Sequence, residues 1–460
     1  MPARLLLKLL GQSWVQSLMD RLRGSPLGYR LARGFAWSTL GAVVARGMAL
    51  LAAVLVARIL GRENYGRLGV VQSTIGMFSI FAGFGLGITA TKYVAEFRTK
   101  DPERARRLIA MSGFVAAIAG SLMSVVLMVL APWLATRTLA APELSRLLTI
   151  AAPMLFLGAV NGAQTGALSG LEAFRAIARV NTWSGLAGFA LMVGGAYLSG
   201  LEGAVLGLVA VLAVNWALNR RALSSEADAA RIPLGVEGAW RESAVLWRFS
   251  VPAALSAIMV GPAYWVCSAI VVNRPRGYEE MGLFNAANQW FGALLFLPGI
   301  LGQVVLPVLS ERLATADHDQ PVRVLTASIV GNGLTVVPLA VIISVASPLI
   351  MLFYGPDFRS GWPTLVVVAI TGALLAVQLP AGQAIAAKGQ MWLGFWMNTG
   401  WALAFVGLTL VLADRGAFGL ALARLAAYGV HTTWTLGWVY AVFRHRERSA
   451  GGNYGNRDAV

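Results

Sequence analysis

Long apolar stretches recur along the whole chain and are separated by short polar segments. Each stretch holds about 20 residues, the length that an α-helix needs to cross a hydrocarbon layer of roughly 30 Å. Backbone groups inside a bilayer must be satisfied within the segment, so these stretches are expected to be helices. The pattern predicts twelve spans: Ala36 to Ala57, Leu68 to Thr91, Leu108 to Ala131, Leu147 to Ser169, Val180 to Leu198, Gly203 to Leu218, Phe249 to Val272, Leu283 to Leu309, Val324 to Ala346, Pro363 to Ala387, Trp392 to Leu412, and Phe418 to Val442.

The composition agrees with this pattern. Of the 460 residues, 57% are hydrophobic and 13% are charged, and the mean hydropathy is +0.67. A soluble domain has about 25% charged residues. We therefore predict an all-α membrane protein. The single cysteine, Cys267, falls inside a predicted span, which excludes a disulfide framework and a paired-cysteine metal site. We expect neither a metal nor a cofactor.

Positive charge is distributed unevenly about the predicted membrane. The segments on the side of both termini hold 26 of the 37 Lys and Arg residues, and the loops on the other side hold 9. This bias predicts cytoplasmic termini. It also explains the net charge of +16 without nucleic acid, because no sizeable soluble domain exists to bind it. The basic, apolar segment Met1 to Gly24 predicts an amphipathic helix on the inner membrane surface, with a disordered basic tail as the alternative.

The chain contains signs of an internal duplication. The longest hydrophilic segment, Asn219 to Arg248, leaves six spans on either side. A shift of 216 residues aligns "RILGRENYGRLGVVQSTIGMFSIFAG" from Arg58 with "RPRGYEEMGLFNAANQWFGALLFLPG" from Arg274. These matches favour two parallel six-helix repeats. The predicted division is a cytoplasmic amphipathic segment (1–35), an N-lobe (36–218), a cytoplasmic linker (219–248), a C-lobe (249–443) and a cytoplasmic tail (444–460).

Several motifs resemble those of a known family. "LVARILGRENYGRLGVVQSTIGMFSIFAGFGLGITATKYVAEF", "GALSGLEAFRAIARVN", "FSVP", "EEMGLFNAANQ" and "MLFYGPDF" are similar to segments of the oligosaccharide flippases. These flippases are the polysaccharide-biosynthesis branch of the multidrug/oligosaccharidyl-lipid/polysaccharide exporter superfamily. The resemblance covers roughly Arg33 to Phe443. It implies two parallel six-helix lobes around a central cavity, which rock between inward-open and outward-open states. Many members carry an acid in the seventh span, where this chain has "AYWVCSAIVV". The resemblance therefore transfers no ion-coupling acid.

Two arginines lie inside predicted spans. Arg46 is about ten residues into the first span, roughly 15 Å deep and so near the midplane. An arginine there costs about 2.5–3.5 kcal/mol and cannot escape this cost by losing its proton. Arg424 lies about two turns into the last span, on the same helix side as Tyr428 and His431.

No acidic residue lies within a predicted span, so carbonyls, water or an external anion remain as partners for these cations. We predict that Arg46 binds an anion and that Arg424 attracts it from the outer side. A buried structural arginine is the alternative. His431 is a weaker candidate, because interior histidines are commonly satisfied by structural hydrogen bonds.

Amide side chains occupy repeat-related positions inside the spans. The 216-residue shift pairs Gln72 with Asn288, and a second match at 219 residues pairs Gln164 with Gln383. Amides can bind sugar hydroxyls, although hydrogen bonding between helices is an equally good reason for them.

The predicted function is a flippase for an undecaprenyl-pyrophosphate-linked oligosaccharide in surface polysaccharide biosynthesis (O-antigen, capsule or exopolysaccharide). Planar guanidinium groups match phosphate oxygens, whereas an exporter of cationic drugs needs an embedded acid. A lipid II flippase and a cation-coupled multidrug exporter remain alternatives. A membrane polysaccharide polymerase is a remote one, because the outer loops are short and no catalytic motif is present, so we expect no enzyme.

The expected location is the bacterial cytoplasmic (inner) membrane, which the chain crosses many times. The expected partners are the polyprenyl-pyrophosphate-linked oligosaccharide and membrane lipids, without nucleic acid. The resemblance adds polysaccharide polymerase and chain-length proteins as further partners of a monomer.

Overall fold

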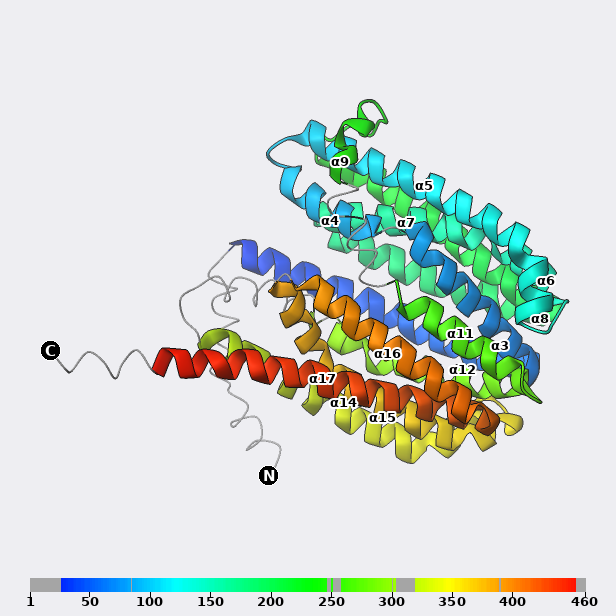
Figure 1. The fold of residues 1–460 in the computed structure, drawn as a ribbon. Helices are drawn as coiled ribbons and strands as arrows, with labels where there is room; N and C mark the ends of the chain where they lie inside the picture. The colour runs from blue at the N-terminus through cyan, green and yellow to red at the C-terminus, as the bar shows by residue number, and fades with distance from the viewer. Residues whose placement is uncertain are drawn as a thin grey trace, which may run out of the picture.

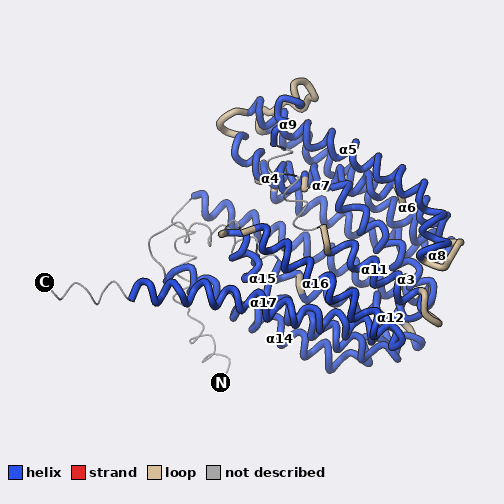
Figure 2. The backbone as a smooth tube through the Cα atoms, viewed as in Figure 1, coloured by secondary structure: helices blue, strands red, loops and turns tan. Residues whose placement is uncertain are grey.

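The computed structural model describes residues 26–83, 85–245, 250, 258–299, 301–302, 319–388 and 390–451. Every regular element among these residues is helical, as Figure 2 shows. This confirms the predicted all-α class. The amphipathic N-terminal helix predicted for Met1 to Gly24 lies outside the described residues.

The helical elements lie along the predicted spans, and the predicted span Leu68 to Thr91 is divided between two of them near Gly85. In chain order they are α3 (Pro26–Gly83), α4 (Leu86–Phe97), α5 (Pro102–Trp133), η1 (Leu134–Thr138), α6 (Leu144–Ala151), α7 (Pro153–Gly170), α8 (Phe174–Ala229), η2 (Ala239–Glu242), α9 (Ser243–Val245), α11 (Val260–Val272), α12 (Gly277–Leu294), α14 (Asp319–Tyr354), η4 (Pro356–Gly361), α15 (Trp362–Ala387), α16 (Met391–Leu412), η5 (Ala413–Arg415) and α17 (Gly416–Gly451).

Long helices contain more than one predicted span. Seven described helical stretches are long and apolar enough to cross a membrane, and three of them, of 43, 56 and 50 residues, are long enough for two crossings. Within α3 the two crossings meet at Gly61, whose φ of 71° is open to glycine at little cost. Within α8 they meet at Ser199 and Gly200. The short "SGLEG" segment is therefore a break between two helices, as the sequence predicts.

One predicted boundary falls inside a helix. The hydrophilic linker is expected from Asn219, yet α8 continues as a helix to Ala229. The intervening residues include good helix formers and arginines whose long side chains reach water from a helix end. Hydrophilic composition ends a membrane span there without ending the helix.

The helices form two lobes. In Figure 1, α4 to α9 make the upper lobe and α12 to α17 the lower one, with the first part of α3 (blue) running between them. The start of α3 and the end of α17 lie at the same end of the bundle, as expected for an even number of crossings. We call this the cytoplasmic end, following the positive-charge bias, and the other the outer end.

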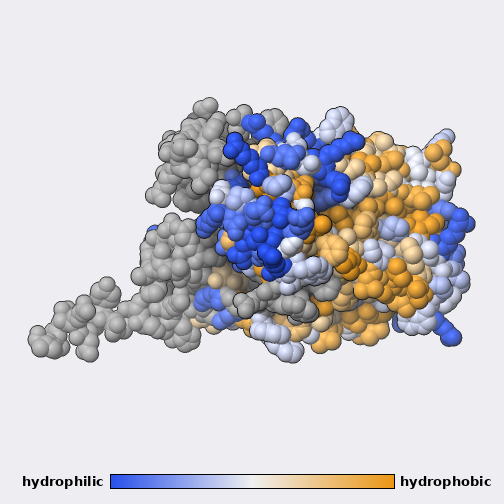
Figure 3. Space-filling view, turned by 90° about the horizontal axis from the view of Figure 1, so that it is seen from above, coloured by the Kyte–Doolittle hydropathy of each residue, from blue (hydrophilic) through white to orange (hydrophobic). Residues whose placement is uncertain are grey.

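The surface has the polarity of a membrane protein. Figure 3 shows a broad apolar band between hydrophilic residues at the two ends of the N-lobe face. Its large apolar side chains are exposed, as in α5, where Leu122 is 56% and Val129 72% accessible. Such a band is unfavourable in water and is favourable against lipid tails.

The lobes meet closely at the outer end. A Cβ on Gly66 would overlap with the Tyr278 carbonyl, and a Cβ on Gly282 would overlap with the Arg62 carbonyl. Gly66 and Gly282 are repeat equivalents, as are Arg62 and Tyr278, so the contact is reciprocal. Gly69 touches Asn285, its own equivalent. This is the geometry of a local twofold axis between two copies of one unit.

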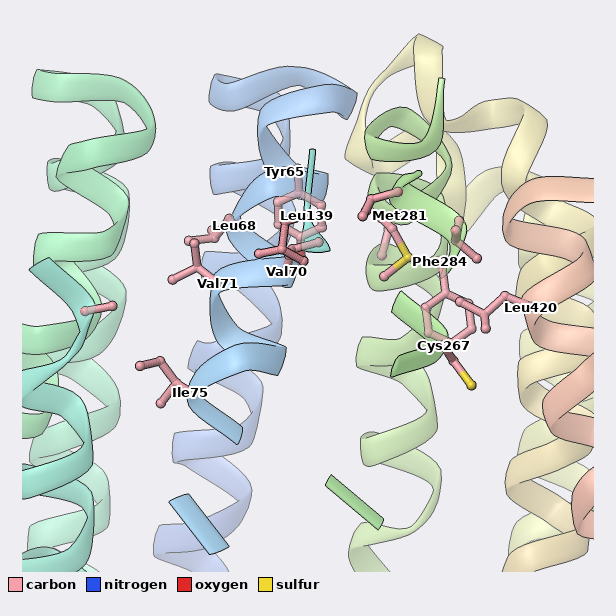
Figure 4. Close-up of a cluster of buried hydrophobic side chains, with 14 of the residues drawn as sticks. Tyr65, Leu68, Val70, Val71, Ile75, Leu139, Cys267, Met281, Phe284 and Leu420 are labelled. Atoms are coloured by element: carbon pink, nitrogen blue, oxygen red, sulfur yellow. The ribbon is translucent and has the colours of Figure 1, made fainter. Parts of the chain in front are cut away.

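Apolar side chains fill the space beside this contact. Tyr65 of α3, Leu139 after η1, and Met281 and Phe284 of α12 are all at most 4% exposed. Figure 4 shows them gathered between α3 and the α11 and α12 pair. The outer contact between the lobes is therefore a packed core, with polar groups around it.

Polar contacts surround this core and form what we call the outer seal. Arg62 donates to the Glu279 carbonyl at 3.0 Å and pairs with the Glu280 carboxylate. Glu280 also accepts from the Ala417 amide at 2.8 Å, which ties in the start of α17. Asn273 and Tyr278 donate to the carbonyls of the N-lobe loop at 2.7 and 2.6 Å. Hydrogen bonding from Arg276 lowers the pKa of Glu279 below its ordinary value, so this carboxylate stays charged.

We predict that Gly66→Val opens the outer seal. The new side chain would occupy the position of the Tyr278 carbonyl, and overpacking of this kind costs about 1–3 kcal/mol. The outer ends should then separate, which spin-label distances between position 146 on the N-lobe and position 359 on the C-lobe would measure.

Gly76→Val is the matched control, because a Cβ there meets nothing within 4 Å. Equal distances in the two variants would show that the glycine contact does not hold the outer ends together.

Candidate functional site

Arg46 lies between the two lobes. It projects from the first crossing of α3, is half-buried, and donates from Nη2 to the Gln289 carbonyl of α12 at 2.8 Å. Its Nε is buried and has no hydrogen-bond partner among the described residues. The positively charged guanidinium is therefore hydrogen-bonded to one neutral carbonyl, and its other N–H groups remain available to a ligand.

The C-lobe makes room for this side chain at a glycine. A Cβ on Gly292 of α12 would overlap with Nη2 of Arg46. The repeat equivalent Gly76 has open space at the same place. Glycine at position 292 therefore leaves space for the Arg46 guanidinium, and any other residue there would displace it.

Arg424 has different surroundings. It is 1% exposed, and its guanidinium carbon lies 3.5 Å from the ring centre of Phe291, 5.0 Å from Tyr264 and 5.9 Å from Tyr428. Its Nη1 donates to the Asn288 side chain at 2.7 Å. Ring faces attract cations, by about 0.5–1 kcal/mol at exposed sites and by about 2 kcal/mol when water is excluded.

These rings are partners that the sequence reasoning leaves out. A cation without an acidic neighbour is expected to contact carbonyls, water or an external anion. Arg424 instead contacts aromatic faces and an amide. Phe291 lies three residues after Asn288 on one helix face, so an aromatic partner could have been inferred from that spacing. In this state Arg424 is enclosed, and Arg46 is the more accessible of the two cations.

The predicted amides are only partly brought together. Asn288 bonds Arg424, whereas Gln72 is half-buried and makes no hydrogen bond to another described residue. Gln164 and Gln383 each have a buried side-chain oxygen without a partner in the described chain. No hydrogen bond between described residues joins any of these four amides to another.

His431 belongs to a small polar group inside the C-lobe. The Gln378 amide hydrogen bonds its Nδ1, and the Gln378 oxygen accepts from Thr432 at 2.6 Å. His431 lines a pocket of about 230 Å³ between α15, α16 and α17, and its Nε2 has no partner among the described groups. Gln378 is not predictable from the sequence, since a single amide in an apolar span carries no distinguishing signal.

The membrane interior contains cations without anions. Within the described parts of the predicted spans, Arg46 and Arg424 are present and no Asp or Glu is. The acids nearest to the lobe interface, Glu279 and Glu280, lie at the outer end and pair with Arg62 and Arg276. The site at Arg46 is therefore suited to an anion from outside the protein.

Comparison with known proteins places this geometry in a family. The sequence profile of the polysaccharide biosynthesis protein family matches residues 31–313. A curated relative, the EPS I polysaccharide export inner membrane protein EpsE of Ralstonia nicotianae, is 25% identical over 85% of this chain and 89% of its own.

Solved structures share the fold. The eukaryotic MATE transporter AtDTX14 superposes with a TM-score of 0.70 at 13% identity, over 92% of this chain and 98% of its own. A MOP superfamily transporter from Pyrococcus furiosus, described by a reversed polarity of its binding pocket, superposes with a TM-score of 0.67 at 14% identity over 92% and 97%. The family match covers more than half of the chain, and the fold agrees with it. The chain belongs to the polysaccharide biosynthesis protein family and shares the fold of multi-pass membrane transporters.

Proposed function

We propose that the protein is a flippase of the inner membrane. It carries an undecaprenyl-pyrophosphate-linked oligosaccharide from the cytoplasmic to the outer leaflet for surface polysaccharide biosynthesis. The observation that supports this most directly is Arg46, a cation between the lobes whose one hydrogen-bond partner among the described residues is a neutral carbonyl.

The chemistry of Arg46 fits a pyrophosphate. Its guanidinium presents five N–H donors in a plane, of which the Gln289 carbonyl takes one. Phosphate oxygens accept such donors in pairs and carry the opposite charge. The polyprenyl tail can stay in the bilayer while the charged group crosses between the lobes.

The relatives support the substrate class. The EpsE protein is named for polysaccharide export in the inner membrane, and it aligns with most of this chain. The Pyrococcus transporter is described as having a pocket of reversed polarity that suggests a different function, which fits the idea that pocket charge selects the cargo in this fold.

A drug-exporter function has less support. A membrane-embedded acid would bind both a cationic drug and a coupling ion. The described part of the predicted spans has cations only, and these would repel a cationic drug.

The outer seal supplies one half of an alternating-access cycle. In this state the lobes are joined at the outer end by the reciprocal glycines and by Arg62 with Glu280. The proposed cycle requires these contacts to open while the cytoplasmic ends of the lobes come together. The head group shifts the balance if one state holds its charge more tightly than the other.

We predict that Arg46→Ala lowers transport about 10- to 100-fold, since hydrogen bonds to charged groups contribute roughly 1.5–3 kcal/mol. The measurement is transfer of a labelled lipid-linked oligosaccharide to the outer leaflet of reconstituted vesicles. Gly292→Ala should also lower transport, because it displaces the guanidinium without removing it.

Arg146→Ala is the control for loss of one arginine, because this side chain is 75% exposed and pairs with Glu202 at the outer surface. If Arg46→Ala transports at the control rate and at equal protein level, Arg46 does not bind the pyrophosphate.

We predict that Glu280→Gln favours the state open to the outside. The change keeps an acceptor for the Ala417 amide but removes the charge that Arg62 needs. Ion pairs of this exposure contribute about 1 kcal/mol or less, so the ratio of the two states should shift by up to about fivefold. Spin-label distances across the outer end would report the shift.

Glu143→Gln removes a charge at the same end of the molecule, but its partner Arg67 is in its own lobe. If Glu143→Gln and Glu280→Gln shift the state ratio equally, the pair between the lobes has no special role in closure.

A further inference from the structure

A groove of about 460 Å³ lies inside the N-lobe, between α4, α7 and the second crossing of α8. We call it the glycine groove. It is separate from Arg46 and from the outer seal. Its lining consists of Gly87, Ile88, Thr91, Gly158, Asn161, Gly162, Thr165, Gly166, Ser169, Leu212 and Asn215. None of these carries a charge, and five have a hydroxyl or amide side chain.

The positions of α7 along the groove are small or polar residues. Gly158, Gly162, Thr165 and Ser169 follow one another at helical spacing and are the exposed or half-buried positions that face the groove. The lipid-facing stripe of the neighbouring helix α5 has the same spacing and opposite chemistry: it consists of Phe114, Ile118, Leu122, Val125 and Val129. The composition of the groove is therefore unlike that of a surface against lipid tails.

Two kinds of glycine build the groove. Gly87 and Gly166 are packing residues, because a Cβ on Gly166 would overlap with the Gly87 carbonyl. Gly158 and Gly162 are different, since a Cβ on either would meet nothing within 4 Å. A glycine inside a helix costs about 0.5–1 kcal/mol relative to alanine, and at these two positions no neighbour fills the place of the missing side chain. What they preserve is open space.

One residue that lines this space has a buried acceptor without a partner among the described residues. Asn161 lines the groove and is 8% exposed; its amide nitrogen donates to the Leu212 carbonyl at 3.0 Å. Its side-chain oxygen has no partner among the described residues. This geometry fixes the amide so that the oxygen, an acceptor, is left over. A buried polar atom of this kind is normally hydrogen-bonded, so the Asn161 oxygen can accept a hydrogen bond from a ligand.

We propose that the glycine groove binds uncharged sugar residues of the transported oligosaccharide. Sugar hydroxyls both donate and accept, so they match a lining of hydroxyl and amide groups, and the Asn161 oxygen can take one of their protons in a hydrogen bond. The volume falls in the range of ligand pockets, about 300–1,000 Å³. The absence of charge in this lining leaves the phosphate to Arg46. The inference rests on the proposed function and adds a second subsite, for the glycan, to the first, for the pyrophosphate.

The test uses full-length protein in lipid nanodiscs and two probes. One is undecaprenyl pyrophosphate without sugar, and the other is the same lipid carrying its oligosaccharide, extracted from the cells that make the protein. Binding of each is measured by native mass spectrometry. We expect Gly162→Leu, which fills the groove, to weaken binding of the sugar-bearing lipid about tenfold and to leave the bare lipid unchanged. Thr165→Val, which removes one hydroxyl at constant shape, should give a smaller loss of the same kind.

Gly113→Leu is the matched control. Gly113 is in α5, away from the groove, and a Cβ there also meets nothing within 4 Å. It reports what leucine in place of an unpacked glycine does to these helices, and it should bind both lipids as the parent does.

Other outcomes overturn the inference. Equal weakening of both lipids by Gly162→Leu would assign the groove to the lipid portion, and unchanged binding of both would show that the groove is not used. If the parent binds neither lipid, the proposed function fails and this inference fails with it. If Arg46→Ala weakens both lipids while Gly162→Leu weakens neither, the proposed function stands without the glycan subsite.

Discussion

The reciprocal approach of two backbones at the outer end determines much of this architecture. Gly66 and Gly282 each lie against a carbonyl of the other lobe, so the outer ends of α3 and α12 come close enough for side chains to interlock around them. The same approach places the Gln289 carbonyl and Gly292 beside Arg46, further along the two helices. The position of the cation between the lobes is thus a consequence of how the lobes touch.

The charges do not follow the symmetry of the helices. A shift of 216 residues takes Arg46 to Pro262, and the reverse shift takes Arg424 to Leu208. The helices are repeated, but each arginine occurs once. The cavities also differ between the lobes, since the glycine groove in the N-lobe is larger than the pocket beside His431 in the C-lobe. A frame with approximate twofold symmetry therefore has different chemistry on its two sides.

Much of the fold is predictable from the sequence because a bilayer leaves so few options for an apolar segment of about 20 residues. The breaks at Gly61 and Gly200 also fall where short polar segments interrupt the apolar pattern. The site is less predictable. Arg46 is identifiable from its depth, whereas the aromatic surroundings of Arg424 depend on which faces of α11, α12 and α17 meet. The groove is still harder to predict, because the sequence does not show that the space beside Gly158 and Gly162 is open.

The contact between Gly69 and Asn285 bears on how the protein arose. In a dimer of two identical chains, the residue on the axis meets its own copy, so both must be small or both must be large. Once the two units are joined in one gene, each position can mutate independently. A glycine can then accommodate an asparagine across the axis, and a single arginine can replace a pair of repelling ones. Fusion thus permits a single asymmetric binding site, whereas a symmetric dimer has either two equivalent sites or one symmetric site on its axis.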